Sequence, residues 1–299
     1  AEVDDLARVL PDLPGPARLT GDVHGEGEGL VGNVSLTGPR GISLTADGRY
    51  EDGASQAHVD GSLDDLGIFL PQLPGAAQIL ADVQQTGAED YEGTLRILSE
   101  GGSEVTADGV YGPGKTNARI DAQLTDLAAF VPQLPGAASL NGQVEEGDDG
   151  YTGTIRAETA DGSTVNARGT YSPTSLTADF DAALANLGIF VPQMPGQASV
   201  TGNVVQNGSA YDAVLRARTA DGSTVDADAT YSPTEIQATF DAVLANLGIF
   251  VPQMAGQASV TGQVTQNGDA YDGTVSARAA DGSVLDATGT YGPGQTQGQ

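Results

Sequence analysis

The sequence predicts an all-β fold, an elongated antiparallel sheet of four-stranded repeats of about 60 residues, with one short helical turn per repeat and a curl that forms a groove. Three observations predict it. A proline-bounded segment recurs at a fixed spacing, apolar and polar residues alternate at period two between its copies, and turn-forming residues separate the alternating runs.

The recurring segment divides the chain into copies of one unit. It is clearest at residues 186–196 and 246–256, recognisable at 126–136 and 65–75, and looser at 5–15. A fixed period is typical of repeat architectures, in which each unit packs on its neighbours. We therefore expect a single repeat array over residues 1–299, with repeats at approximately 5–64, 65–125, 126–185, 186–245 and 246–299.

Each repeat is expected to contain four strands with one apolar and one polar face. In the third copy, Tyr151, Gly153 and Ile155 alternate with Thr152 and Thr154, the pattern of a half-buried strand. Three further runs of residues 137–184 show the same alternation. Four strands in each of four copies and three in the last make nineteen.

Turn residues lie at matching places in each copy. Asn207-Gly208 and Asn267-Gly268 predict two-residue type I′ turns between the first and second strands. Between the second and third strands, residues 160–162 and their counterparts 220–222 and 280–282 read Ala-Asp-Gly, which predicts a three-residue loop with a left-handed final glycine. Residues 172–175 and 232–235 predict proline-led turns before the fourth strand.

Small residues recur at one level of the predicted sheet. The alternation places them in one row of the third copy and in the equivalent row of the fourth, namely Gly142, Gly153, Gly169 and Ala178, and then Gly202, Ala213, Ala229 and Ala238. Rows of bare backbone allow a sheet to crease. We expect a gutter, and the alternative is that small residues accept a packed second sheet.

The proline-bounded segment predicts one helical turn. Asp or Asn precedes the leucine in all five copies, as an N-cap residue does. Leu187, Phe190, Val191 and Met194 then follow at i, i+3, i+4 and i+7, and Pro192 ends regular helix. The apolar stripe would either line the apolar side of the sheet or plug the core of each repeat.

Composition excludes several functions. The 299 residues carry 12 Lys and Arg against 40 Asp and Glu, a formal charge of −28, which disfavours nucleic-acid binding. Cysteine is absent, so the chain has no disulfides or thiol chemistry. No apolar run approaches eighteen residues and no signal peptide begins the chain, so we expect a soluble segment whose export signal or anchor lies outside it.

No catalytic, metal or cofactor constellation is found in the sequence, so we expect no enzyme. The two histidines, His24 and His58, do not recur, and His58 belongs to the polar side of its strand. The nine tyrosines occupy matching apolar-side positions, which indicates packing. The repeated Asp161, Asp221 and Asp281 leave calcium as an alternative, although hairpin loops explain them without an ion.

The segment D-L-x-x-F-V-P-Q-L-P-G followed by A-S-L-x-G-x-V, set in an array of short strands, resembles the repeat region of the TamB family, within the AsmA-like group of repeating β-groove proteins. The resemblance covers residues 5–291. It implies a curled sheet, the β-taco, with a hydrophobic groove and no catalytic residues. It also implies periplasmic transport of phospholipid between inner and outer membrane, and support for outer-membrane protein assembly.

The family's signal-anchor helix and outer-membrane end have no counterpart here, so the resemblance implies a middle fragment whose inner-membrane anchor lies outside it. Implied partners are phospholipid acyl chains and a BamA-related, TamA-like outer-membrane barrel. The alternative is a structural or adhesive surface array in which every repeat closes its own core. The expected groove lining consists of Ile79, Val83, Leu95, Val105, Ile120, Leu140, Val144, Ile155, Val165, Phe180, Val200, Val204, Leu215, Val225 and Phe240.

Overall fold

The computed structural model describes residues 2–5, 7, 14–233, 235–292 and 295–298. The chain forms two compact units, Ala1–Asp148 and Asp149–Gln299. The boundary between them falls inside the third predicted repeat, between its first and second strands. The single repeat array therefore stays a prediction.

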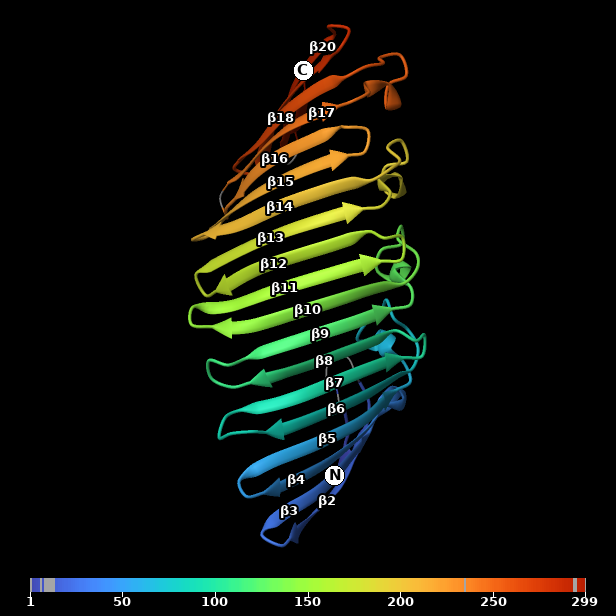
Figure 1. Ribbon diagram of the computed structural model, residues 1–299, viewed down its shortest axis with the longest axis vertical. Coiled ribbons are helices and arrows are strands. Elements are labelled where there is room, and N and C mark those ends of the chain that lie inside the picture. Colours follow the sequence, from blue (N-terminus) through green and yellow to red (C-terminus); the bar gives the residue numbers. More distant parts are fainter. Residues whose placement is uncertain (1, 6, 8–13, 234, 293–294, 299) are drawn as a thin grey trace. The chain divides into compact units, whose positions relative to one another are not determined.

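The first unit is an open antiparallel sheet in which consecutive strands pair (Figure 1). Its strands are β1 (Glu2–Val3), β2 (Ala17–Glu26), β3 (Gly29–Thr37), β4 (Ser43–Glu51), β5 (Ala54–Leu63), β6 (Ala77–Gln85), β7 (Tyr91–Ser99), β8 (Glu104–Tyr111), β9 (Asn117–Leu124) and β10 (Ala138–Gly147).

The second unit has the same construction. Its strands are β11 (Gly150–Thr159), β12 (Thr164–Ser172), β13 (Ser175–Leu184), β14 (Ala198–Asn207), β15 (Ala210–Thr219), β16 (Thr224–Tyr231), β17 (Ile236–Leu244), β18 (Ala258–Asn267), β19 (Ala270–Ala279), β20 (Val284–Gly292) and β21 (Gln295–Gly298). The all-β, antiparallel prediction is confirmed, and β2 to β20 are the nineteen expected strands.

Helical structure in the described residues is limited to single 3₁₀ turns at one end of the strands (Figure 1). These turns are η2 (Pro39–Gly41), η3 (Leu66–Ile68), η4 (Leu127–Ala129), η5 (Leu187–Ile189) and η6 (Leu247–Ile249). The predicted N-caps are present, because the Asn186 side-chain oxygen accepts hydrogen bonds from Gly188 N at 3.0 Å and Gly196 N at 3.1 Å. Leu6 and residues 8–13 of the first copy lie outside the described residues, although Asp5 caps Ala7 and Gly15 in the same way.

The predicted three-residue loops are confirmed. Thr159 N donates to Ser163 O at 2.9 Å across Ala160, Asp161 and Gly162, and Gly162 has a φ of 87°. The proline-led turn at residues 172–175 is also present, closed by the Ser172–Ser175 pair. Its counterpart at 232–235 includes Thr234, which lies outside the described residues.

The predicted type I′ turns at Asn207-Gly208 and Asn267-Gly268 are wrong by one residue. Asn207 still pairs with Ala210, so the turn consists of Gly208 and Ser209, and Gly208 has the positive φ of 64°. Moving a two-residue turn by one position shifts the strand pairing by two, which places Val204 opposite Ala213.

The same shift corrects the predicted glycine row. Gly202 pairs with Phe180 on one side and Leu215 on the other, not with Ala213. Gly142 likewise pairs with Ile120 of β9. A Cβ built on Gly202 would lie 2.2 Å from the Phe180 ring, so the aromatic ring covers the bare backbone. The observed small-residue row of the second unit consists of Gly153, Gly169, Ala178, Val204, Ala213, Ala229, Ala238, Val264, Gly273 and Gly289.

The buried core of the first unit is small and lies beside the 3₁₀ turns. Leu63, Leu66 and Ala77 are among its five buried residues, and Ile68 and Leu73 pack against them. In the second unit the fully buried apolar residues described are Ala198, Ala242 and Ala258. The turns therefore cover only one end of the apolar face.

Exposed surface confirms that the sheets are not enclosed. The chain exposes 18082 Å². Two separate compact globules of half its mass of 30.2 kDa would together expose about 14,000 Å². The difference is the surface of open sheets that no other described segment of the chain covers.

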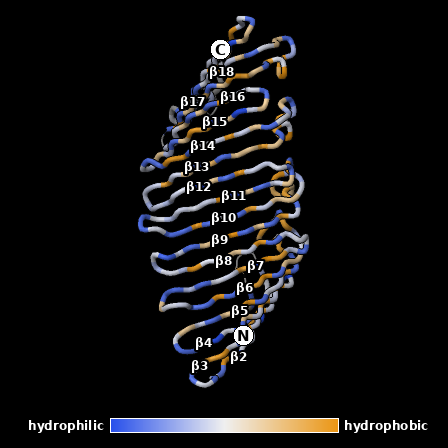
Figure 2. The backbone as a smooth tube through the Cα atoms, viewed as in Figure 1, coloured by the Kyte–Doolittle hydropathy of each residue, from blue (hydrophilic) through white to orange (hydrophobic). Residues whose placement is uncertain are grey.

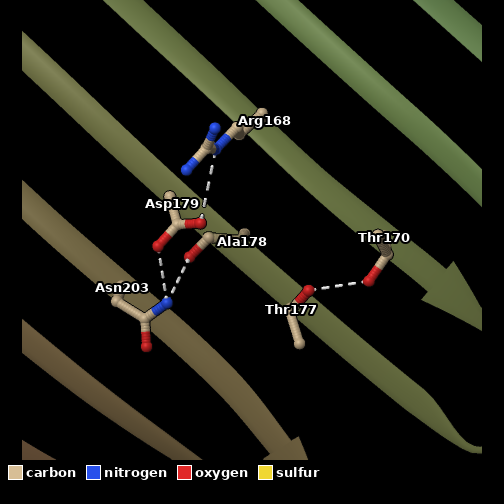
Figure 3. Close-up of polar contacts among 6 residues, drawn as sticks. All are labelled: Arg168, Thr170, Thr177, Ala178, Asp179 and Asn203. Carbon is tan, nitrogen blue, oxygen red and sulfur yellow. Dashed lines mark hydrogen bonds and ion pairs between the residues drawn. The ribbon is translucent and has the colours of Figure 1, made fainter.

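On the polar face, side-chain hydrogen bonds link neighbouring strands (Figure 3). Asp179 of β13 accepts from Asn203 Nδ2 at 2.8 Å and lies 3.6 Å from Arg168 Nε. Thr170 and Thr177 are joined through their hydroxyl groups at 2.7 Å. These side chains occupy the polar face, as the alternation predicts.

Candidate functional site

The candidate site is the apolar face of the sheet in each unit. Hydrophobic residues alternate with polar ones along the strands and also mark the 3₁₀ turns (Figure 2). None of the fifteen predicted lining residues is fully buried. The exposed ones are Val83, Ile120, Val144, Ile155, Val165 and Leu215, and the half-buried ones are Ile79, Leu95, Val105, Leu140, Phe180, Val200, Val204, Val225 and Phe240.

The strand register brings these residues into rows within each unit. In the first unit, one row runs from Ile79 through Ile97, Val105 and Ala122 to Leu140. In the second, one row contains Val165, Val200 and Val225, separated by alanines. The neighbouring row of the second unit runs Ile155, Ala167, Phe180, Gly202, Leu215, Ala227 and Phe240.

A hollow of about 500 Å³ lies on the apolar face of the first unit. Its floor is the Gly93–Gly109 pair of β7 and β8, where two neighbouring positions lack side chains. Val83, Leu95 and Tyr111 are among the residues that surround this floor. The surface is almost wholly apolar, so the hollow suits a hydrocarbon group.

Two sets of aromatic residues border the apolar face. Tyrosines pair across the second and third strands of a copy, and the ring centroids of Tyr211 and Tyr231 are 6.4 Å apart. Their assignment to packing is wrong for Tyr111 and Tyr171, which are 65% and 55% exposed. Alternation identified the face but did not indicate that nothing covers it.

The second aromatic border belongs to the 3₁₀ turns. The apolar stripe of these turns is only partly buried, because its phenylalanine is exposed in each described copy, at Phe69, Phe130, Phe190 and Phe250. A single 3₁₀ turn is too short to direct all four stripe positions to one side. Leu66, the leucine at the first position of η3, is buried in the core of the first unit, whereas its counterparts in η4, η5 and η6 are half-buried.

The N-cap residue differs in charge between the two units. Asp126 accepts hydrogen bonds from Gly136 N and Ala128 N, which lower the pKa of its carboxyl group. Asn186 and Asn246 make the same two bonds without a titrating group. The η4 cap therefore stabilises the folded chain at pH values above the ordinary pKa of aspartate. This stabilisation is lost as the pH falls through the lowered pKa of Asp126.

Replacing Asp126 with asparagine is expected to remove this part of the acid sensitivity. The amide oxygen keeps the cap, so unfolding midpoints of Asp126→Asn should match the wild type near neutral pH and exceed it below about pH 4. Asn186→Asp is the reverse control and should add acid sensitivity. Thermal unfolding followed by circular dichroism at several pH values measures both, and parallel pH curves for all three proteins would contradict the assignment.

The polar face also carries hollows, which the expectation of a groove on the apolar face did not include. One of about 670 Å³ in the first unit is lined partly by Arg49, His58, Asp82 and Asp108. One of about 460 Å³ in the second unit includes Asp226. Concavity therefore occurs on both faces of the first unit, and the direction in which the sheet curls does not select the apolar face there.

His58 lies on the polar face as predicted. Its Nδ1 is 2.7 Å from Asp82 Oδ1, and Asp47 lies opposite it on β4. The hydrogen bond with Asp82, followed by the charges of Asp82, Asp60 and Asp47, raises the pKa of the imidazole. Half of the side chain is exposed, so this is a surface ion pair.

The His58 pair is expected to make stability fall as pH rises past neutrality. A raised folded pKa stabilises the protein fully below the ordinary value of 6.5, and this contribution disappears as pH rises through the folded value. His58→Gln should flatten the dependence of the thermal midpoint on pH between about pH 6 and 8. Identical slopes in His58→Gln and the wild type would refute this expectation.

The Ala-Asp-Gly loops account for their aspartates without calcium. Asp161 accepts hydrogen bonds from Ser163 N at 3.0 Å, from Ser163 Oγ at 3.1 Å and from the Thr159 hydroxyl. These bonds, with that of Thr159 foremost, lower the pKa of Asp161. Within the described residues, no three acidic or histidine side chains are placed to hold a metal ion.

The fold and this site define an all-β protein with an uncovered apolar sheet face. Among the described residues, no helix has the length and apolar character needed to cross a membrane. Comparison with family models, curated proteins and solved structures found no match.

Proposed function

We propose that this chain is a hydrophobic-groove protein that moves phospholipid between the inner and outer membranes through the periplasm and supports outer-membrane protein assembly. The observation that supports it best is the uncovered apolar face. Ile155 and Val165, for example, are 50% and 41% exposed on neighbouring strands of the second unit, where a second layer would normally cover them.

Acyl chains would cover the apolar face in place of a second protein layer. Each methylene that leaves water gains about 0.8 kcal/mol, so a lipid chain of ordinary length crosses an aqueous gap only if an apolar surface accompanies it. The rows of valine, leucine and phenylalanine offer such contact without a directional polar requirement. The lipid would slide along these rows from strand to strand, because neighbouring strands present similar side chains.

The periplasmic setting, the inner-membrane anchor and the BamA-related, TamA-like barrel partner rest on the resemblance of residues 5–291 to the TamB family. The proposed groove would be the β-taco of that family. The role proposed for the protein is carriage and involves no catalysis.

A structural or adhesive surface array is the second candidate. The regular hydrogen-bonded ladder of the polar face, such as Thr170–Thr177 and Asp179–Asn203, favours it. A structural array of this kind would need a closed core in every repeat. The apolar rows described above are exposed instead. We therefore rank it below lipid carriage.

Lipid extraction tests the proposal. The protein should be expressed with export to the periplasm of a Gram-negative host, purified without detergent, and analysed by native mass spectrometry and by mass spectrometry of an organic extract. Carriage predicts phospholipid in stoichiometric or greater amounts. Folded protein with no bound lipid, together with failure to accept lipid from vesicles, would favour the structural array.

A further inference from the structure

Two of the Asn-Gly dipeptides of the sequence lie in different backbone settings. Asn207 ends β14 and Gly208 opens the two-residue turn to β15, whereas Asn141 and Gly142 lie inside β10. Both asparagines are exposed, and the side-chain amide of each donates a hydrogen bond to an aspartate carboxylate on the facing strand. The two sites therefore differ in how the backbone is held and not in exposure or in the partner of the amide.

An asparagine that is followed by glycine can lose its side-chain amide without an enzyme. The backbone nitrogen of the glycine attacks the side-chain carbon Cγ, a new C–N bond closes a cyclic succinimide, and the side-chain nitrogen leaves as ammonia together with the proton of the glycine N–H. Water then opens either carbonyl of the ring, which yields aspartate or isoaspartate. Glycine favours the attack because it has no side chain and adopts many backbone angles. The peptide unit between the two residues must rotate, so a backbone held on both sides prevents the reaction.

The backbone at Asn207 is free to make this rotation. Within the described part of the chain, Gly208 N donates no hydrogen bond, and a Cβ built on Gly208 would find no atom within 4 Å. Rotation of the peptide unit disturbs the Asn207–Ala210 pair, which closes the hairpin, and the bond from the Gln206 amide to Gly208 O. Contacts at the end of a hairpin open more often than those inside a sheet. The attacking nitrogen can therefore reach Cγ in the folded protein.

The backbone at Asn141 is held in the sheet. Gly142 pairs with Ile120 of β9, and the residues before and after it are paired with β9 as well. Rotation of the Asn141–Gly142 peptide unit would break this ladder in its interior, where local opening costs more free energy than at a hairpin end. The same dipeptide is therefore protected at this position.

We infer that Asn207 is a site of spontaneous deamidation in the folded protein and that Asn141 is protected from it. This inference goes beyond the proposed function and does not depend on it. Aspartate at position 207 replaces an amide that donates to the Asp212 carboxylate with a second carboxylate, so attraction becomes repulsion. Isoaspartate also lengthens the main chain by one methylene group beside the Asn207–Ala210 pair. Either product loosens the hairpin of β14 and β15.

Peptide mapping of the aged protein tests the site. The full chain is incubated in mildly alkaline buffer, once folded and once in urea, and each asparagine is followed by mass spectrometry. Isoaspartate is detected separately with an isoaspartyl methyltransferase and a labelled methyl donor. In the folded protein, Asn141 should convert at least about tenfold more slowly than Asn207, because interior strand residues open less often. In urea the two should convert at similar rates, because glycine follows both.

Two variants separate the chemistry from its consequence. Asn207→Gln keeps a side-chain amide but would have to close a larger ring, so conversion at this position should disappear. Asn207→Asp reproduces one product, and amide hydrogen exchange should become several-fold faster in the turn and in the adjoining ends of β14 and β15, while exchange in β10 stays unchanged.

Three results would overturn the inference. They are equal conversion of Asn207 and Asn141 in the folded protein, faster conversion of Asn141, and an intact Asn207 at a time when the sample in urea has reacted. Hydrogen exchange in Asn207→Asp that matches the wild type would refute the loosening of the hairpin. None of these results bears on lipid carriage.

Discussion

Replacing Ile155 and Leu215 with aspartate is expected to lower the phospholipid bound to the purified protein about tenfold, because each change places a charge under the acyl chain. Both residues belong to one row of the apolar face, with Phe180 between them. They are 50% and 37% exposed, so neither is part of a buried core whose loss would unfold the unit. Phosphorus content per mole of protein after detergent-free purification measures the effect.

The matched control adds the same charge to the other face of the same unit. Thr152 and Thr154 lie on the polar side of β11 and pair with Thr170 and Arg168. The double variant Thr152→Asp with Thr154→Asp should therefore carry as much lipid as the wild type. If both double variants lose lipid equally, the added charge and not the apolar face is responsible. Full lipid content in the Ile155 and Leu215 variant would exclude carriage on this face.

Local sequence signals predicted the helical N-caps and the three-residue loops, because the interactions that form them span few residues. Asn186 caps Gly188 two positions later and Gly196 ten positions later, and both contacts lie inside the repeated segment. The left-handed glycine of the Ala-Asp-Gly loop has the same local origin, with Asp161 bonded to Ser163 two residues later.

Hairpin register could not be derived from the same signals. Asn207-Gly208 and Gly208-Ser209 are both acceptable two-residue turns, and they differ by a small free energy. In the structure, the Gln206 amide donates to Gly208 O at 2.9 Å and Asn207 bonds Asp212, and these contacts favour the second turn. At Asp52-Gly53, by contrast, both residues have positive φ, as a type I′ turn requires.

The exposure of the apolar face could not be predicted from the sequence either. A period of two shows that Val83 and Ile155 share faces with other apolar residues, but a sheet face of this composition is equally suited to a second protein layer. Whether such a layer exists depends on the whole chain. The exposed tyrosines were misassigned for this reason, since Tyr111 has the sequence context of a packed residue and is 65% exposed.

Gly109→Ala is expected to reduce the free energy of unfolding of the first unit by about 1–3 kcal/mol, as overpacking does. A Cβ built at this position would lie 2.5 Å from Asn117 O and 3.1 Å from Ala118 Cα. Both atoms are backbone of the adjacent strand β9, so the strands must separate to admit the methyl group. Urea unfolding followed by tyrosine emission and circular dichroism measures the change.

Gly48→Ala is the control that isolates this close approach. Gly48 is in the same small-residue row of the first unit, linked to Gly109 through Ala57, Val83 and Gly93. The nearest atom to a Cβ built there is Gln56 O at 3.6 Å, an ordinary contact. Alanine should therefore stabilise this position by up to about 1 kcal/mol, because it restricts the unfolded chain. Opposite signs for the two variants would show that the close approach of β8 and β9 requires glycine at position 109, whereas equal effects would mean that glycine serves only backbone freedom in this row.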